Sequence, residues 1–340
     1  MRPRTAVASA AIASGVVAAG LVGRAVFRHR HASGRWVDVD PPEDLGTVMS
    51  FDGTALAVRA AGDPTAPVLV LSHGFSLDAT TWARLWPELA GEFRVVVFDH
   101  RSHGRSGPAA HGDLSLRAIG RDLAAVIDAA APGEPVIVVG HSMGAMAILA
   151  LAEQRPELFG ERIVGATFLG AAATDLVRGA MGSITGVLRP RLGSFGDAAR
   201  RVERLRRAVL AGPTDLSAAV ARLTQFGPDV PHEVVDHVVA LAERARREVW
   251  TEGLAELMAM DLLHAVPRVR VPSLVVVGAH DRVTPPATGI ELAGALPEGR
   301  LVAFEDAGHM VMLERPEALA AELRSFARAV FEDATRKGAA

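Results

Sequence analysis

The chain has 340 residues, of which 49% are hydrophobic, and its formal net charge is -3. This composition supports a large buried core and gives no reason to expect a nucleic acid as partner. The absence of cysteine excludes disulfides, thiolate zinc sites and cysteine nucleophiles. The single lysine, Lys337, lies near the end of the chain, which argues against a Walker A loop or a Schiff-base lysine in the body.

The first 35 residues differ in character from the rest. Residues 5–23 carry no charged side chain, and arginines flank them on both sides. A helix of this length can cross the hydrocarbon core of a bilayer. We therefore expect residues 1–35 to act as a single-pass anchor that associates the protein with a membrane, with the side of the membrane left open. A cleaved signal peptide, giving a secreted protein, and a flexible leader are the alternatives.

After this segment, short runs rich in β-branched residues alternate with longer stretches of helical period. Such alternation is typical of a mostly parallel sheet with crossover helices, an α/β fold. The predicted strands are Thr47–Ser50, Ala55–Ala60, Val68–Ser72, Arg94–Phe98, Val136–Val139, Ile163–Leu169, Ser273–Val277 and Leu301–Phe304. The predicted helices between and after them are Thr81–Ala90, Leu116–Ala130, Met143–Gln154, Ala287–Ala295 and Pro316–Phe331.

Between the sixth and seventh predicted strands the alternation stops for about a hundred residues, too long for a structureless loop in a compact domain. We predict helices at Asp197–Leu210, at Asp215–Gln225 and, with interruptions, at His232–Leu263. The expected organisation is an α/β core at residues 36–170 and 264–340 with a helical cap at 171–263. Apolar residues near the end of the cap, among them Leu257 and Met258, either line an acyl pocket or belong to the core.

The strongest motif is Gly140-His141-Ser142-Met143-Gly144, which stands between a predicted strand and a predicted helix. Glycines on both sides of the serine permit a tight strand-to-helix turn that exposes the hydroxyl of Ser142. The same turn aims the amide of Met143, at the start of the helix, toward an oxyanion forming beside the serine. This context indicates that Ser142 is a nucleophile.

A serine needs a base to take its proton, and His309 is the best placed of the histidines. It follows the last predicted strand in Ala307-Gly308-His309, at the edge of the sheet where open α/β sheets bind ligands. Asp281, shortly after the strand Ser273–Val277, is the expected carboxylate partner, and Asp175 and Asp306 are its rivals. The resulting chain order Ser, Asp, His matches the α/β-hydrolase arrangement.

A second oxyanion donor is expected from the loop after the third strand, Ser72-His73-Gly74-Phe75. The amide of Phe75 would face that of Met143, and Gly74 allows the backbones to approach closely. We assign His73, Gly74 and His141, which adjoin the oxyanion donors and the serine, to substrate binding.

Together these residues resemble the α/β-hydrolase superfamily, especially its esterases, lipases and cofactor-free haloperoxidase-like members. The resemblance covers roughly residues 45–331 and rests on five ordered motifs. These are His73-Gly74-Phe75, the loop Phe98–Gly107, Gly140–Gly144, Asp281 and Ala307-Gly308-His309. It implies an eight-stranded, mostly parallel sheet, a helical cap, no cofactor and acyl transfer through an acyl-serine.

One departure from the superfamily narrows the expected chemistry. Haloalkane dehalogenases and epoxide hydrolases of this type use an aspartate at the position of Ser142, so these chemistries are not expected. His100 and His103 with Asp99 suggest a metal site, but no larger cluster of ligands accompanies them, and we predict no metal.

The sequence thus predicts a serine hydrolase that cleaves small carboxylic esters with an apolar acyl group. The alternatives are a carbon-carbon bond hydrolase or a cofactor-free haloperoxidase or perhydrolase with the same triad, and a non-catalytic ligand receptor of the same fold.

Overall fold

The computed structural model describes residues 42–174, 200, 204 and 214–338. The predicted anchor at residues 5–23, the predicted helix Asp197–Leu210 for nearly its whole length, and the rival carboxylate Asp175 therefore lie outside the described residues. Within the described ranges, no helix combines the length and apolar character that crossing a bilayer requires.

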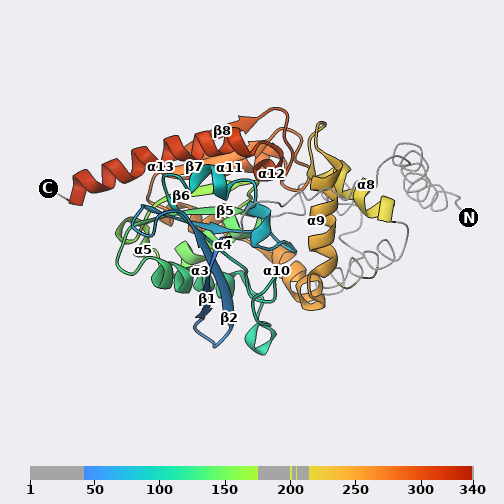
Figure 1. Ribbon diagram of the computed structural model, residues 1–340, viewed down its shortest axis with the longest axis horizontal. Helices are drawn as coiled ribbons and strands as arrows, with labels where there is room; N and C mark the ends of the chain where they lie inside the picture. The colour runs from blue at the N-terminus through green and yellow to red at the C-terminus, as the bar shows by residue number, and fades with distance from the viewer. Residues whose placement is uncertain (1–41, 175–199, 201–203, 205–213, 339–340) are drawn as a thin grey trace, which may run out of the picture.

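An eight-stranded sheet forms the centre of the molecule, with the strand order β1-β2-β4-β3-β5-β6-β7-β8 (Figure 1). β1 and β2 pair antiparallel, as do β2 and β4, and all other neighbours are parallel. The predicted eight-stranded, mostly parallel sheet is confirmed. The strands are β1 Glu43–Met49, β2 Ala55–Ala61, β3 Val68–Ser72, β4 Arg94–Phe98, β5 Val136–His141, β6 Ile163–Leu169, β7 Ser273–Gly278 and β8 Gly299–Phe304.

The central strands are apolar because both of their faces are covered. In β3 every residue is buried, with Val68 and Val70 in one core cluster and Leu69 and Leu71 in another. Successive side chains of a strand point to opposite faces, so these are the two layers of core on either side of the sheet.

Helices cover both faces of the sheet. One core cluster contains residues of α3 Leu116–Ala130, α4 Met143–Gln154 and α11 Pro286–Ala295. The other contains residues of α2 Trp86–Leu89, α12 Val311–Glu314 and α13 Pro316–Gly338. The short elements η1 Ala79–Trp82, η2 Ala110–Gly112 and α5 Leu158–Glu161 connect strands to helices.

The predicted helix Thr81–Ala90 is wrong as a single element. The structure has a 3₁₀ turn, η1, that ends at Trp82, and a separate short helix, α2, that begins at Trp86. Pro87 lies in the first turn of α2. A proline has no amide to donate to the preceding turn, so the helix can begin there but cannot continue through it.

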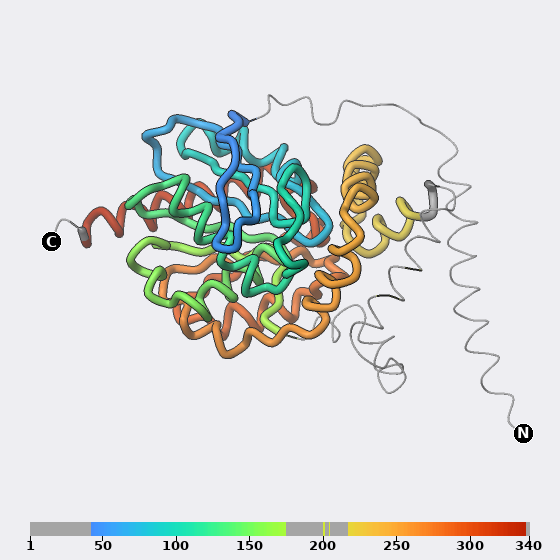
Figure 2. The backbone as a smooth tube through the Cα atoms, turned by 90° about the horizontal axis from the view of Figure 1, so that it is seen from below, coloured from blue at the N-terminus to red at the C-terminus, as the bar shows by residue number. Residues whose placement is uncertain are grey.

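Between β6 and β7 the described chain forms α8 Thr214–Gln225, α9 His232–Arg244, the π-helical turn η4 Val249–Gly253, α10 Leu254–Ala259 and the 3₁₀ helix η5 Leu263–Arg268. We call residues 214–259 the insert. Figures 1 and 2 show α8 and α9 at one end of the molecule, beside the core. The predicted helix Asp215–Gln225 is confirmed, and the predicted interruptions of His232–Leu263 fall at residues 245–246 and 260–262.

Candidate active site

Ser142 occupies a strained turn between β5 and α4. Its φ is 51° and its ψ is -116°, a conformation that costs free energy for any residue with a side chain. Glycines make the turn possible. A Cβ at Gly140 would lie 2.5 Å from the nitrogen of Ala145, and one at Gly144 would lie 2.0 Å from the carbonyl oxygen of Ser72. The structure therefore explains why both positions around the serine need glycine.

The turn places Ser142 at the N-terminal end of α4, with Met143 as the first helical residue. Amides in the first turn of a helix have no partner inside the helix and face whatever lies beyond its end. The amide of Met143 is thus available for the oxyanion role expected of it.

His309 and Asp281 form a buried hydrogen-bonded pair. Nδ1 of His309 lies 2.7 Å from Oδ2 of Asp281, and their side chains are 6% and 1% exposed. The carboxylate is itself held in place, because its Oδ1 accepts hydrogen bonds of 2.8 Å from the amides of Val283 and Thr284. The hydroxyl of Thr284 donates to Oδ2 across 2.7 Å. Every contact fixes the direction in which the carboxylate faces the imidazole.

The backbone and ring of His309 are fixed from other sides. Its amide donates to the carbonyl oxygen of Gln225 at 2.7 Å. Its carbonyl oxygen accepts a hydrogen bond from Nε2 of His141 at 3.0 Å, and the two imidazole rings are 4.7 Å apart. Gly170 borders the ring, since a Cβ there would lie 3.0 Å from Nδ1.

The structure brings His309 and Ser142 to the same neighbourhood. His141 directly precedes the serine, and the amide of Ser142 donates to the carbonyl oxygen of Leu169, the residue before Gly170. Among the described residues, neither the Ser142 hydroxyl nor Nε2 of His309 has a hydrogen-bond partner. These two groups are therefore unpaired. The hydrogen bond between a nucleophile and its base is often long or poorly aligned until a substrate binds.

Asp306, a rival for the role of acid, lies elsewhere. Its side chain is 60% exposed and pairs with Nε of Arg315 at 2.7 Å. The geometry favours Asp281 over it.

The loop that carries Phe75 is held from behind by two histidines. Nδ1 of His73 donates to the carbonyl oxygen of Gly74 at 2.8 Å, and its Nε2 accepts from the amide of His100 at 3.0 Å. Nε2 of His103 accepts from the amide of Ser76 at 3.3 Å. His73 is fully buried and both of its ring nitrogens are used, so its side chain supports the loop and leaves no atom for the substrate contact we expected.

His141 has a similar position. It is 1% exposed, and a Cβ on Gly74 would lie 2.7 Å from its Nδ1. The ring of His141 therefore fills the space between His309 and residues 73–76, which carry Phe75 and which we call the oxyanion loop. We interpret it as a spacer that fixes both, rather than as the substrate-binding group predicted from the sequence.

Burial keeps these histidines neutral. It lowers the pKa of His73 to about 4 and that of His103 to about 3. It also holds the pKa of His100 and of His141 well below the ordinary value. A neutral imidazole has one nitrogen that donates and one that accepts, as the bonds of His73 require. Within the described part of the chain, no three side chains of the metal-ligating types are placed to hold a metal ion.

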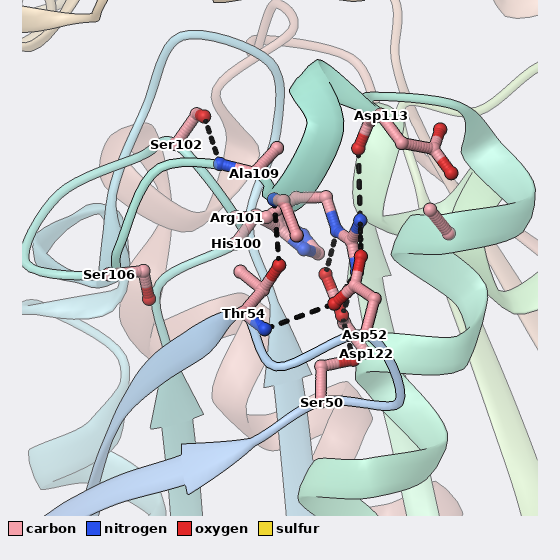
Figure 3. A network of polar contacts seen from close by, with 12 residues as sticks. Ser50, Asp52, Thr54, His100, Arg101, Ser102, Ser106, Ala109, Asp113 and Asp122 are labelled. Carbon is pink, nitrogen blue, oxygen red and sulfur yellow. Dashed lines mark hydrogen bonds and ion pairs between the residues drawn. The ribbon is translucent and has the colours of Figure 1, made fainter.

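The loop Phe98–Gly107, which carries two of these histidines, is tied to the core by Arg101 (Figure 3). This guanidinium is completely buried, with Nε 2.6 Å from Oδ2 of Asp122 and Nη1 2.9 Å from Oδ2 of Asp52. Nη1 also donates to the carbonyl oxygen of Asp113 at 2.9 Å. A buried charge is tolerable only when it is paired and fully hydrogen-bonded, and Arg101 meets both conditions.

One contributor to the site, Thr284, was missed by the sequence reasoning. Its position three residues after Asp281 in a loop could have indicated this role. At that spacing an aspartate accepts hydrogen bonds from the turn that follows it.

A mostly parallel sheet covered by helices, a serine at a strained strand-to-helix turn and a buried His–Asp pair at the same edge define a hydrolase. The alpha/beta hydrolase family matches residues 69–322, and the chain belongs to that family.

Three proteins to which the chain is similar are between 26% and 30% identical to it. A protein named probable oxidoreductase EphD from Mycobacterium tuberculosis is 30% identical over 295 residues, which cover 82% of this chain and 49% of that protein. The chain thus spans about half the length of this relative. A pimeloyl-[acyl-carrier protein] methyl ester esterase from Neisseria meningitidis serogroup B is 28% identical over 261 residues, covering 75% of this chain and 91% of the relative. Among solved structures, the enol-lactonase from Burkholderia xenovorans LB400 superposes with a TM-score of 0.66 at 26% identity, covering 83% of this chain and 99% of the other.

Proposed function

We propose that the protein is a serine hydrolase that cleaves carboxylic esters with an apolar acyl group. The observation that carries the proposal is the buried hydrogen bond between His309 and Asp281 beside the strained turn of Ser142. The names of two relatives, a methyl ester esterase and an enol-lactonase, describe enzymes that act on acyl–oxygen bonds, and they support the same reaction class.

In the proposed reaction, Nε2 of His309 takes the proton of the Ser142 hydroxyl as its oxygen attacks the ester carbonyl carbon. Asp281 holds the imidazole by Nδ1 and stabilises its positive charge. The amides of Met143 and Phe75 stabilise the oxyanion of the tetrahedral intermediate. His309 then gives its proton to the leaving alcohol, and a water molecule, deprotonated by His309, releases the acid from the acyl-serine.

The preference for an apolar acyl group is supported by aromatic side chains next to the oxyanion loop. The ring of Phe75 packs edge to face against that of Trp250, which belongs to the π-helical turn η4, with ring centroids 5.0 Å apart. π-Helical turns occur often at functional sites. Leu257, one of the apolar residues considered above for the acyl pocket, lies instead in the core cluster that includes α3 and α4, and we do not assign it to the pocket.

Turnover of p-nitrophenyl esters of increasing acyl length tests the proposal, together with labelling by a fluorophosphonate. We expect the wild-type protein to react with both and Ser142→Ala to react with neither. Equal behaviour of the two proteins would overturn the proposal and leave the ligand-receptor interpretation. Reaction with the fluorophosphonate without ester turnover would indicate a serine enzyme with another substrate, such as a carbon-carbon bond hydrolase or a perhydrolase.

A further inference from the structure

Glu314, the last residue of α12, has a buried carboxylate that none of the proposed catalytic steps uses. It is 7% exposed. Its Oε1 accepts a hydrogen bond from the amide of Gly308 at 2.9 Å, and its Oε2 accepts one from the amide of Gly227 at 2.7 Å. Gly308 directly precedes His309, and Gly227 lies just after α8 in the insert. One carboxylate therefore joins two segments that lie far apart in the sequence.

The end of α8 makes two further bonds to the candidate active site. The carbonyl oxygen of Gln225, its last residue, accepts the amide proton of His309 at 2.7 Å. The carbonyl oxygen of Leu223 accepts a hydrogen bond from Arg282, the neighbour of Asp281, at 3.0 Å. The last carbonyl groups of a helix have no partner inside it. Here they are bonded to the candidate base and to the residue beside the candidate acid.

The two segments also touch backbone to backbone. A Cβ at Gly227 would lie 2.6 Å from the carbonyl oxygen of Asp306, and one at Gly308 would lie 2.6 Å from the carbonyl carbon of Phe226. At these two points the backbones of the two segments meet directly, with no side chain between them. We call residues 305–310, which carry His309, the histidine loop. Because close-packed contacts of this kind transmit displacement rather than absorb it, a shift of the end of α8 must move the histidine loop as well.

Only a carboxylate suits the position of Glu314. Burial holds the pKa of Glu314 above its ordinary value, although hydrogen bonds from the amides of Gly227, Gly308 and Met310 act in the opposite direction. An ionised carboxylate accepts on both oxygens and donates on neither, which matches a set of N–H donors. A glutamine would place its own NH₂ group against one of these amides.

We propose that Glu314 is a positioning residue that locks the end of α8 to the histidine loop and so sets the orientation of the His309 imidazole. The inference rests on the proposed function, because it assigns His309 the role of base. It adds a route by which a substrate that contacts the insert would influence the base.

The test compares Glu314→Gln with Asp306→Asn. Both replace an acid by its amide near His309, but Asp306 is exposed and bonded to Arg315. We expect Glu314→Gln to lower kcat for a p-nitrophenyl ester by about tenfold to a hundredfold per fluorophosphonate-titrated site, with KM within about twofold, because a displaced base affects chemistry more than binding. We expect Asp306→Asn to match the wild type. An unchanged kcat per titrated site in Glu314→Gln, even with a lowered Tm, would show a merely structural role and overturn the proposal.

A second readout does not depend on ester turnover. The Nδ1 proton shared by His309 and Asp281 should give a downfield NMR resonance, identified by its absence in Asp281→Asn. We expect this resonance to shift or broaden in Glu314→Gln and to stay in place in Asp306→Asn. A resonance unchanged in Glu314→Gln would overturn the proposal. If the wild type showed the resonance but no ester turnover, the proposed function would fail while the coupling was still tested.

Should Glu314→Gln not fold, Glu314→Asp replaces it in both experiments. The shorter carboxylate keeps the charge but cannot reach both amides in the same geometry. We expect the same direction of change in kcat and in the resonance, and wild-type behaviour of a folded Glu314→Asp protein would overturn the proposal.

Discussion

Nδ1 of His309 donates to Oδ2 of Asp281 across 2.7 Å, although the two residues lie 28 positions apart in the chain. This bond places the proton of the neutral imidazole on Nδ1 and leaves the lone pair of Nε2 for the serine hydroxyl. Because the carboxylate accepts from two amides and a hydroxyl as well, the tautomer is fixed before any substrate arrives.

Asp281→Asn should lower kcat by about 10⁴-fold, because an amide at this position can stabilise the wrong tautomer and does not stabilise the imidazolium ion. Steady-state kinetics with a p-nitrophenyl ester measure the effect. Asp306→Asn is the matched control and should keep wild-type kcat. A loss of activity in the control with retention in Asp281→Asn would reverse the assignment of the acid.

Thr284→Val should lower kcat by about tenfold, since it removes one hydrogen bond to a charged group while keeping the shape of the side chain. The lost donor is the hydroxyl that bonds to Oδ2 of Asp281 at 2.7 Å. Thr288→Val is the control, because the hydroxyl of Thr288 donates to the carbonyl oxygen of Ala171 at 3.1 Å and not to the carboxylate. Equal kinetics of the two variants would show that Thr284 does not orient the acid.

The free energy of unfolding should fall as the pH drops from 6.5 toward 4. Burial lowers the pKa of His73 to about 4 and that of His103 to about 3, so below pH 6.5 the unfolded chain binds protons that the folded protein does not. The stability contributed by the neutral histidines is therefore complete above pH 6.5 and is lost as the pH falls through the lowered values. Each histidine contributes a slope of up to about 1.4 kcal/mol per pH unit.

Urea unfolding of His103→Asn between pH 7 and 5 measures this slope. The variant should lose about one histidine's share of it, whereas His111→Asn, which changes an exposed histidine, should keep the wild-type slope. Burial raises the pKa of Asp99 and of Asp122, which contributes to the pH slope with the opposite sign. Because this contribution is common to all three proteins, the difference between their slopes reports the histidine alone. The same slope in all three would contradict neutral burial of His103.

Deletion of residues 1–35 should release the protein from the membrane fraction of the cells that express it. The prediction rests on the uncharged segment at residues 5–23 and its arginine flanks. Fractionation and immunoblotting of the full chain and the deletion measure it, with esterase activity of the deletion as proof that it folds. A full chain found in the soluble fraction would contradict the anchor, and cleavage near residue 35 would favour a secreted protein.

The buried strands were predicted well because buried parallel strands are short, continuous apolar runs bounded by turns. The exposed edge strand β1 lacks such a run, and it begins at Glu43 rather than at the predicted Thr47. β3 and β4 begin and end where the sequence predicted. The break between η1 and α2 was missed because Pro87 occupies a first-turn position, which propensity alone does not distinguish from a position inside a helix.

The three residues proposed as the triad were recognisable because each follows a strand in a motif with a chemical purpose. The residues that hold them were not. Glu314 acts on amides of the insert and of the histidine loop, and those contacts exist only in the folded chain. His73 and His141 looked suited to substrate contact by their positions, but their burial behind the loop depends on packing that the sequence does not display.

The bonds between the end of α8 and the histidine loop also set a limit on protein engineering. The limit concerns exchange of the insert for that of a relative. Here such an exchange would need to keep the position of residues 223–227 beside Glu314, because a displaced helix end would leave the amide of His309 and the guanidinium of Arg282 without their acceptors. A chimera that replaces only residues before 223 or only residues after 227 keeps this segment, and one that replaces the whole insert exchanges it.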